Sequence, residues 1–238
     1  CLIQRNVAKS SASTSPNGGG VWMSGGLLEN CDIRNNQAQS GSPDSGGGVY
    51  ATGGTIRNCL IVRNTAVKAG SGAWVQKTVL ENCTISGNYN ADSLTCTGLQ
   101  AGSGSVIRNT VVYGNTNKNA GPANVTSAVG AIFENTLTTD DCTEMGVIVG
   151  DPAFVDAANG DWHVGFGPCV DAGTNQAWMV GATDLDGNGR VQNNIVDLGC
   201  YETDPNDDLK CGIKVTTDGA FDLSMVTLTA TVGGADPA

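Results

Sequence analysis

One nine-residue segment recurs along the first half of the chain, and this repeat constrains the fold more than any other feature. The segment reads Leu28-Glu-Asn-Cys31-Asp-Ile33-Arg-Asn-Asn36, and modified copies begin at Ile56, Leu80, Ile107 and Phe133. Its fourth position recurs at intervals of 30, 28, 24, 27 and 26 residues, at Cys1, Cys31, Cys59, Cys83, Thr110 and Thr136. A period of this length indicates a solenoid in which each repeat forms one coil.

A second segment keeps step with the first and points to strands. It is rich in glycine and ends in an apolar residue followed by an aromatic one, as in Gly46-Gly-Gly-Val49-Tyr50. Short apolar runs separated by Gly, Ser and Asn turns predict two or three strands per repeat, with no helix between them. We therefore predict an all-β chain, a right-handed parallel β-helix of about five to six coils.

Equivalent positions in successive coils should stack at the inter-strand spacing of about 4.8 Å. Four columns follow: an inward column of Ile and Leu, an asparagine ladder, a cysteine column, and an outward column that alternates in charge. We expect the cysteines to be buried thiols, because parallel Cβ vectors do not favour a disulfide. The columns are Leu28, Ile56, Leu80 and Ile107; Asn30, Asn58, Asn82, Asn109 and Asn135; Cys31, Cys59 and Cys83; and Glu29, Arg57, Glu81, Arg108 and Glu134.

An aromatic column is the first candidate binding site. If Val21, Val49 and Ala73 point inward, strand alternation points Trp22, Tyr50 and Trp74 outward. Stacked aromatic rings with polar edges suit the C–H faces and hydroxyls of sugars. The alternatives are that a loop covers these rings or that the alternation is inverted, which would place them in the core.

After about residue 142 a different pattern replaces the repeat. It includes Asp151-Pro-Ala-Phe-Val-Asp156, Gly160-Asp-Trp162, Gly167-Pro-Cys-Val-Asp-Ala-Gly173 and Asp197-Leu-Gly-Cys-Tyr-Glu202. In this order the motifs resemble the C-terminal signature of the choice-of-anchor Q domain family, which consists of secreted bacterial β-helix proteins. The glycine-rich segments also resemble the repeat of polymorphic outer-membrane proteins. The resemblance covers residues 1–202 and implies a fold and a secreted or cell-surface location rather than a reaction.

The expected domain organisation follows from these patterns. Residues 1–141 form the β-helix, 142–202 form an irregular β cap over its open end, and 203–208 form a linker. Residues 209–238 resemble the first two strands of a PKD-type immunoglobulin-like module. Within the cap we expect a disulfide between Cys169 and Cys200, which suits an oxidising compartment. The chain opens in the middle of a repeat, so we expect it to be a piece of a longer protein.

A candidate calcium loop lies in the expected cap. Asp184-x-Asp186-x-Asn188 has the spacing of Ca²⁺ ligands, and Arg190 would contribute a backbone carbonyl. The glutamate expected at the twelfth position is replaced by Ile195. The alternative is an Asp/Asn/Gly turn that closes a hairpin.

Charge and motif content limit the function. The net charge of −11 disfavours nucleic acid as a partner, and no apolar run is long enough to span a membrane. The chain has a single histidine, His163, which excludes zinc sites with several histidines. We expect a monomeric, non-catalytic module that binds a polysaccharide or a cell-surface glycan. The alternative is a polysaccharide lyase or glycoside hydrolase, for which the candidate carboxylates are the adjacent pair Asp140 and Asp141.

Overall fold

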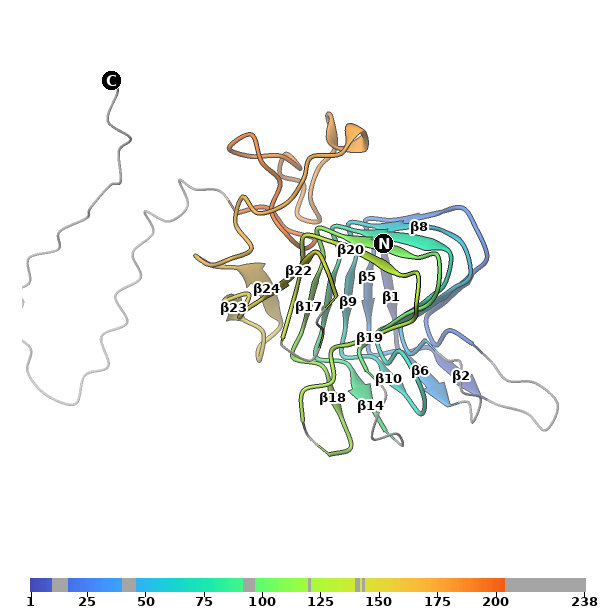
Figure 1. The fold of residues 1–238 in the computed structure, drawn as a ribbon. Helices are drawn as coiled ribbons and strands as arrows, with labels where there is room; N and C mark the ends of the chain where they lie inside the picture. The colour runs from blue at the N-terminus through green and yellow to red at the C-terminus, as the bar shows by residue number, and fades with distance from the viewer. Residues whose placement is uncertain are drawn as a thin grey trace, which may run out of the picture. The chain divides into compact units, whose positions relative to one another are not determined.

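The computed structural model shows the predicted all-β solenoid (Figure 1). It describes residues 1–9, 17–39, 46–91, 97–119, 121–139, 142 and 144–203. All the described residues belong to one compact unit, which spans residues 1–205. The predicted strands of residues 209–238, and the predicted linker beyond Thr203, lie outside the described residues.

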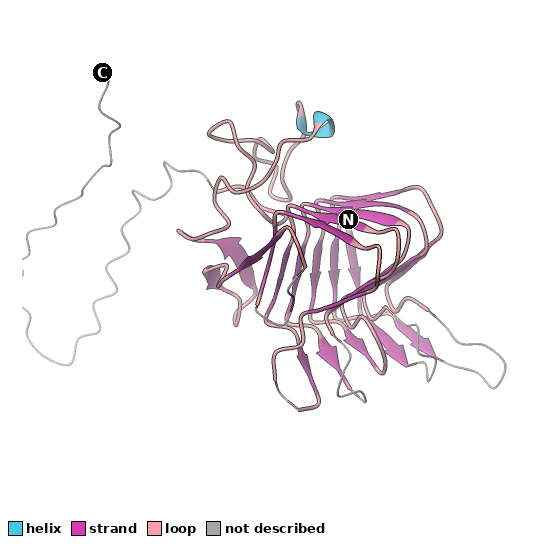
Figure 2. Ribbon diagram, in the orientation of Figure 1, coloured by secondary structure: helices cyan, strands magenta, loops and turns pink. Residues whose placement is uncertain are grey.

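Four parallel sheets build the solenoid, and each is the product of one stacked column of short strands (Figure 2). Consecutive strands of each coil lie in different sheets, so every pairing joins equivalent residues of neighbouring coils. Four complete turns are present, with an incomplete turn at each end. Parallel pairing and a strictly kept register confirm the parallel β-helix that the repeat predicts.

The first sheet has seven strands and is called the seven-stranded sheet. Its strands, in spatial order, are β1 (Leu2–Gln4), β5 (Asp32–Arg34), β9 (Leu60–Val62), β13 (Thr84–Ser86), β17 (Val111–Tyr113), β21 (Thr136–Thr138) and β22 (Val147–Val149). The second carries the column of alternating charge and is called the charged sheet. Its strands are β4 (Leu27–Glu29), β8 (Gly54–Arg57), β12 (Thr78–Glu81), β16 (Val106–Arg108) and β20 (Ile132–Glu134).

The third sheet carries the aromatic column and is called the aromatic sheet. Its strands are β3 (Val21–Met23), β7 (Val49–Ala51), β11 (Ala73–Val75), β15 (Leu99–Ala101) and β19 (Val125–Ser127). The fourth sheet consists of β2 (Val7–Lys9), β6 (Gln37–Gln39), β10 (Thr65–Ala66), β14 (Tyr89–Asn90) and β18 (Thr116–Asn117). Outside the solenoid, β23 (Phe154–Asp156) and β24 (Asp161–Val164) form an antiparallel pair, and η1 (Ala177–Met179) is a single 3₁₀ turn.

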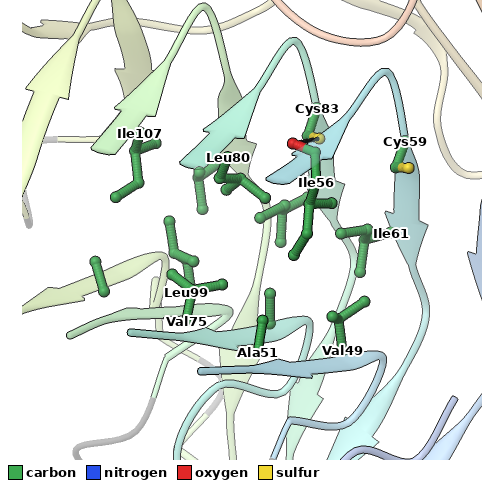
Figure 3. Close-up of a cluster of buried hydrophobic side chains, with 14 of the residues drawn as sticks. Val49, Ala51, Ile56, Cys59, Ile61, Val75, Leu80, Cys83, Leu99 and Ile107 are labelled. Atoms are coloured by element: carbon green, nitrogen blue, oxygen red, sulfur yellow. Dashed lines mark hydrogen bonds between the residues drawn. The ribbon is translucent and has the colours of Figure 1, made fainter. Parts of the chain in front are cut away.

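The predicted inward residues fill the space between the sheets. Ile56, Leu80 and Ile107 are fully buried and point from the charged sheet toward Val75 and Leu99 of the aromatic sheet (Figure 3). The cysteine column borders this core, and Cys31, Cys59 and Cys83 are buried free thiols, as expected. Because each coil adds the same apolar side chains, the core continues without interruption along the axis.

Two asparagine ladders hold the corners of the coils. Asn30, Asn58, Asn82, Asn109 and Asn135 all have φ between 47° and 53°, the left-handed region that asparagine tolerates better than most residues. A second ladder runs inside the solenoid and consists of Asn6, Asn36, Asn64, Asn88, Asn115 and Asn124. In it, each side-chain amide donates to the next side-chain oxygen over 2.9–3.1 Å.

The C-terminal region, defined here as residues 150–203, departs from the expected position. We expected residues 142–202 to cover the open end of the solenoid. Instead, most of them pack along its side, over the outer face of the seven-stranded sheet and the first asparagine ladder (Figure 1). The reason is that this sheet is apolar on its outer face as well: Leu60, Val62 and Val111 are outward and fully or almost fully buried.

Candidate functional site

The C-terminal region docks on the solenoid through the first asparagine ladder. The side-chain amides of Asn58, Asn82 and Asn109 donate to the backbone carbonyls of Thr183, Asp197 and Thr174, over 2.9, 3.2 and 2.9 Å. Apolar contacts complete the interface, and the largest buried ring in it is that of Trp162, which packs on Leu60 and Val62. The corner of the coils therefore serves as a row of hydrogen-bond donors that positions the site described below.

A buried charged network holds the C-terminal region together. The Arg190 side chain is fully buried and forms an ion pair with Glu202 at 3.1 Å, and it also donates to Asn58 Oδ1 and to the carbonyl of Gly199. Burial raises the pKa of Glu202 to about 8 against the opposing effect of Arg190. Burial likewise raises the pKa of Asp197, whose two carboxylate oxygens accept from the backbone N–H groups of Asp171 and Thr203.

The single histidine, His163 of β24, contacts the hairpin closed by Thr183 and Gly189, which contains Asp186. His163 Nδ1 lies 2.5 Å from Asp161 Oδ1, and Nε2 lies 2.7 Å from Asp186 Oδ2. Its ring also lies against Tyr201, with centroids 4.0 Å apart. Partial burial would lower the pKa of His163, but the two carboxylates outweigh this and raise it. Both ring nitrogens thus face a carboxylate, so the His163 ring bridges Asp161 and Asp186.

A pocket of about 520 Å³ lies between this hairpin and the start of the solenoid. Asn30 and Asp32 line it from the solenoid, and Asp186 and Tyr201 line it from the C-terminal region. Burial raises the pKa of Tyr201, with further contributions from Asp186 and Asp32, so its hydroxyl stays protonated and can donate. The pocket thus combines carboxylate acceptors, an amide and the edge of an aromatic ring, a set that suits a ligand rich in hydroxyls.

The cations near this pocket are already engaged. Arg34 forms an ion pair with Asp32, its neighbour on the outer face of β5, and its guanidinium lies 5.8 Å from the centroid of a Trp162 ring. Arg63 also lies against Trp162, 5.0 Å from a ring centroid, and donates to the carbonyls of Ala157 and Ala158. Neither arginine has a lone pair to accept a proton, because guanidinium groups stay protonated in proteins.

The predicted aromatic column stacks, but it is unevenly exposed. The rings of Tyr50 and Trp74 are stacked with centroids 4.5 Å apart, and the two residues are only 7% and 9% exposed. They form a small cluster with Ala69 outside the main core. Strand alternation therefore directs the two rings outward, as predicted, but they are covered rather than exposed. Trp22 is 59% exposed and is the member of the column with a free surface.

The predicted calcium residues Asp184, Asp186 and Asn188 lie in one hairpin turn. The Asp184 carboxylate is buried and accepts from the backbone N–H groups of Asp186, Asn188 and Glu202 and from the Asn188 side chain. These four donors occupy the lone pairs that a cation would need. The side chain of Arg190 belongs to the buried network, and Thr183 bridges Gly189 across the hairpin. This arrangement is that of the Asp/Asn/Gly turn, and among the described residues no three His, Cys, Asp or Glu side chains are grouped to hold a metal.

The remaining predicted residues fall into two groups. Cys169 and Cys200 are buried free thiols rather than the expected disulfide. They lie in different clusters, Cys169 against Val111 of β17 and Cys200 against Leu60 of β9. Asp140 and Asp141 lie outside the described residues.

Sequence reasoning missed the residues that form the pocket. Asp161 and His163 are two positions apart, so on a strand they share a face, and this spacing is the one local signal for their pairing. Their contact with Asp186 and Tyr201 has no such signal, because these residues are 23 and 38 positions further on in segments without a repeat. Among the described residues, no helix is long and apolar enough to cross a membrane.

Comparisons of the chain with protein-family models, with curated proteins and with solved structures gave no significant match. The class that the fold itself defines is the parallel β-helix, a solenoid whose coils stack as parallel strands.

Proposed function

We propose that this protein is an extracellular β-helix module that binds a neutral glycan in the pocket between the solenoid and the C-terminal region. The observation that carries the proposal is the pocket of about 520 Å³, which is lined by Asn30, Asp32, Asp186 and Tyr201. Carboxylates accept hydrogen bonds from sugar hydroxyls, and an amide both accepts and donates them. The tyrosine offers an apolar edge to the C–H groups of the sugar ring.

Charge supports a neutral rather than an acidic glycan. The pocket carries the carboxylates of Asp32 and Asp186, and Arg34, on the same strand as Asp32, is already paired with Asp32. Residues 139–238 contain three Lys/Arg and seventeen Asp/Glu, a net charge of −14. A uronate chain would meet repulsion there, whereas a neutral chain would not.

Binding is favoured over catalysis because both carboxylates of the pocket are already engaged, Asp32 by Arg34 and Asp186 by His163. His163 uses both ring nitrogens, and the arginines are protonated and engaged. A lyase needs a group that removes a proton, and a hydrolase needs an acid and a base or nucleophile on opposite sides of the bond.

The order of motifs between Asp151 and Glu202 supports a finer assignment. We place the protein among the secreted β-helix proteins of the choice-of-anchor Q kind, at or outside the bacterial surface. In this assignment the aromatic column is a second, smaller contact surface led by Trp22.

The test is retention of the full chain on immobilised neutral polysaccharides and on polygalacturonate, with released oligosaccharides measured in the same samples. We expect retention on a neutral polysaccharide, no release of products, and loss of retention in the Asp32→Asn/Asp186→Asn double variant. His163→Gln is the matched control, because it breaks the bridge to Asp186 without removing a group that lines the pocket. It should keep most of the binding.

The outcomes separate the alternatives. Loss of retention in Trp22→Ala but not in the double variant would move the site to the aromatic sheet. Release of oligosaccharides would make the protein an enzyme, and retention on no polysaccharide would overturn the proposal. Adding EGTA to the retained sample tests calcium: we expect the protein to stay bound.

A further inference from the structure

Each carboxylate of the glycan pocket is paired with a basic side chain. The Arg34 Nε atom donates to Asp32 Oδ1 over 2.6 Å, and a terminal nitrogen of the same guanidinium contacts Asp32 Oδ2. His163 Nε2 lies 2.7 Å from Asp186 Oδ2. A carboxylate has about four acceptor sites, so both carboxylates can still accept hydrogen bonds from sugar hydroxyls. The pairing therefore changes the charge that a ligand meets more than the number of hydrogen bonds it can form.

The pair of Asp32 and Arg34 is the less exposed of the two. The Arg34 and Asp32 side chains are 29% and 23% exposed. Those of His163 and Asp186 are 39% and 49% exposed, so solvent screens the arginine pair less. A guanidinium also stays protonated in proteins, so the pairing with Arg34 does not depend on pH. Arg34 is therefore the cation with the larger effect on the charge of the pocket.

The Trp162 ring packs beside Arg34 and offers a matched comparison. Trp162 is buried, and the Arg34 guanidinium lies 5.8 Å from a centroid of its ring. Arg63 lies against the same residue at 5.0 Å, but its guanidinium donates to the carbonyls of Ala157 and Ala158. The two arginines thus share one packing partner, and Arg34 is the one that bonds a carboxylate of the pocket.

The charges of this pair reach the pocket. Burial is the main cause of the raised pKa of Tyr201; Asp32 raises it further, and Arg34 opposes this effect. Without the arginine, Asp32 would present an unbalanced negative charge beside Tyr201 in the pocket. An unbalanced carboxylate favours an ammonium group over a hydroxyl, because hydrogen bonds between charged groups are the stronger ones.

We propose that Arg34 is a specificity-determining residue of the glycan pocket: by pairing with Asp32, it makes the pocket select neutral sugars over amino sugars, which carry an ammonium group. The inference rests on the function proposed above and adds a class of glycan that the pocket rejects. Acidic sugars are repelled by the carboxylates, and amino sugars lose the attraction that an unpaired Asp32 would supply. Arg34 acts through Asp32, so it is a positioning residue and not part of the pocket wall.

The test compares cello-oligosaccharides with chitosan oligosaccharides, which share one linkage and differ in carrying a hydroxyl or an ammonium group at one ring carbon. Binding to the full chain is measured by calorimetry at about pH 5.5, above the ordinary pKa of aspartate and below that of histidine. We expect the wild type to bind the chitosan oligosaccharide no more tightly than the neutral one. Arg34→Gln keeps a donor for Asp32 but removes the charge, and should bind the chitosan oligosaccharide about fivefold more tightly than the wild type does.

Two further variants separate charge from packing. Arg34→Lys restores a cation beside Asp32 and should return the ratio of the two affinities to that of the wild type. Arg63→Gln removes the other arginine beside Trp162 and should leave this ratio unaltered. An unchanged ratio in Arg34→Gln, an equal gain in Arg63→Gln, no recovery in Arg34→Lys, or a wild type that prefers the chitosan oligosaccharide would each overturn the proposal.

Failure of this inference is distinguishable from failure of the proposed function. Retention of the wild type on a neutral polysaccharide, with no gain for the chitosan oligosaccharide in Arg34→Gln, would leave the glycan module and remove Arg34 as its selector. A gain in Arg34→Gln, with a wild type that is retained on no neutral polysaccharide, would overturn the proposed function. Arg34 would then remain the residue that excludes amino sugars.

Discussion

The solenoid and the C-terminal region bury polar groups in opposite ways. In the solenoid each buried amide has the same partners as the amide one coil away. Asn64 and Asn88 both donate to the next asparagine and to the carbonyl of an isoleucine in the preceding coil, Ile33 and Ile61. In the C-terminal region a single arginine, Arg190, is the centre of the network and contacts Asn58, Glu202 and two backbone carbonyls, those of Asp197 and Gly199.

This difference determines where each region is vulnerable. A repeated ladder spreads its stability over many equivalent contacts, and the loss of one rung leaves the others in place. A network built around a single buried charge depends on that charge, because removing it leaves its partners buried without compensation. The three predictions below test this contrast, beginning with the largest expected effect.

Replacing Arg190 should destabilise the C-terminal region most. Arg190→Met leaves Glu202 and Asp197 buried without their cation, and breaking a buried pair on one side costs about 3–5 kcal/mol. In a Trp22→Phe/Trp74→Phe background, denaturant unfolding followed by circular dichroism and by tryptophan emission should give separated transitions. Trp162 and Trp178 then report on the C-terminal region, and the strands report on the solenoid.

The control is Arg57→Met, which removes a partly exposed cation from the charged column and should cost about 1 kcal/mol or less. The double variant Arg190→Met/Glu202→Leu should recover part of the loss, since both partners of the pair are then gone. A loss below 1 kcal/mol for Arg190→Met alone would contradict the central role of this residue.

Breaking one rung of the inner ladder should have a smaller effect. Asn88→Ala leaves the Asn64 N–H without its acceptor and the Ile61 carbonyl without its donor, and both lie in the buried interior. An unsatisfied buried group costs about 1–3 kcal/mol. Chemical unfolding should show a single transition shifted by this amount, and the exposed Gln39→Ala control should stay within about 0.5 kcal/mol of the wild type. If Asn88→Ala changed the free energy of unfolding as little as the control does, the ladder would not contribute to stability.

The histidine bridge should give the smallest effect, and one that depends on pH. The raised pKa of His163 means that its contribution is present below its ordinary value near 6.5 and is lost as pH rises through the raised value. Its hydrogen bonds lower the pKa of Asp161 despite partial burial, so that contribution is present above about 3.8 and lost as pH falls. The difference in melting temperature between wild type and His163→Gln should therefore be largest at about pH 4–6.5. A difference that grows above pH 8 would exclude the bridge.

The sequence predicts the solenoid well because the information repeats. The inward positions Ile56, Leu80 and Ile107, the left-handed asparagine corners and the charge column all appear where the period places them. The sequence also carries a partial signal that the outer face of the seven-stranded sheet is buried. Leu60-Ile-Val62 is apolar at three successive positions, as expected for a strand buried on both faces. That signal indicates that the strand is covered, but it does not identify the covering segment, which the structure shows to include Trp162 and Cys200.

The candidate site was much less predictable. The pocket joins Asp32 to Asp186, and the buried network joins Asn58 to Arg190, which are 132 positions apart. Motif spacing suggested a calcium loop for Asp184, but the structure fills its carboxylate with N–H donors from the same turn and from Glu202. Local patterns in this region were compatible with several arrangements, and the neighbouring solenoid chose among them.

The sequence alone determined the period, the register and the side of each strand that faces the core, because every coil packs on a near copy of itself and equivalent residues must meet. Only the tertiary structure decided where residues 150–203 lie and which side chains they bring together. Those contacts involve a segment without a repeat and a surface without a period, so their pairing depends on shape and on the burial of specific charges around Arg190 and His163.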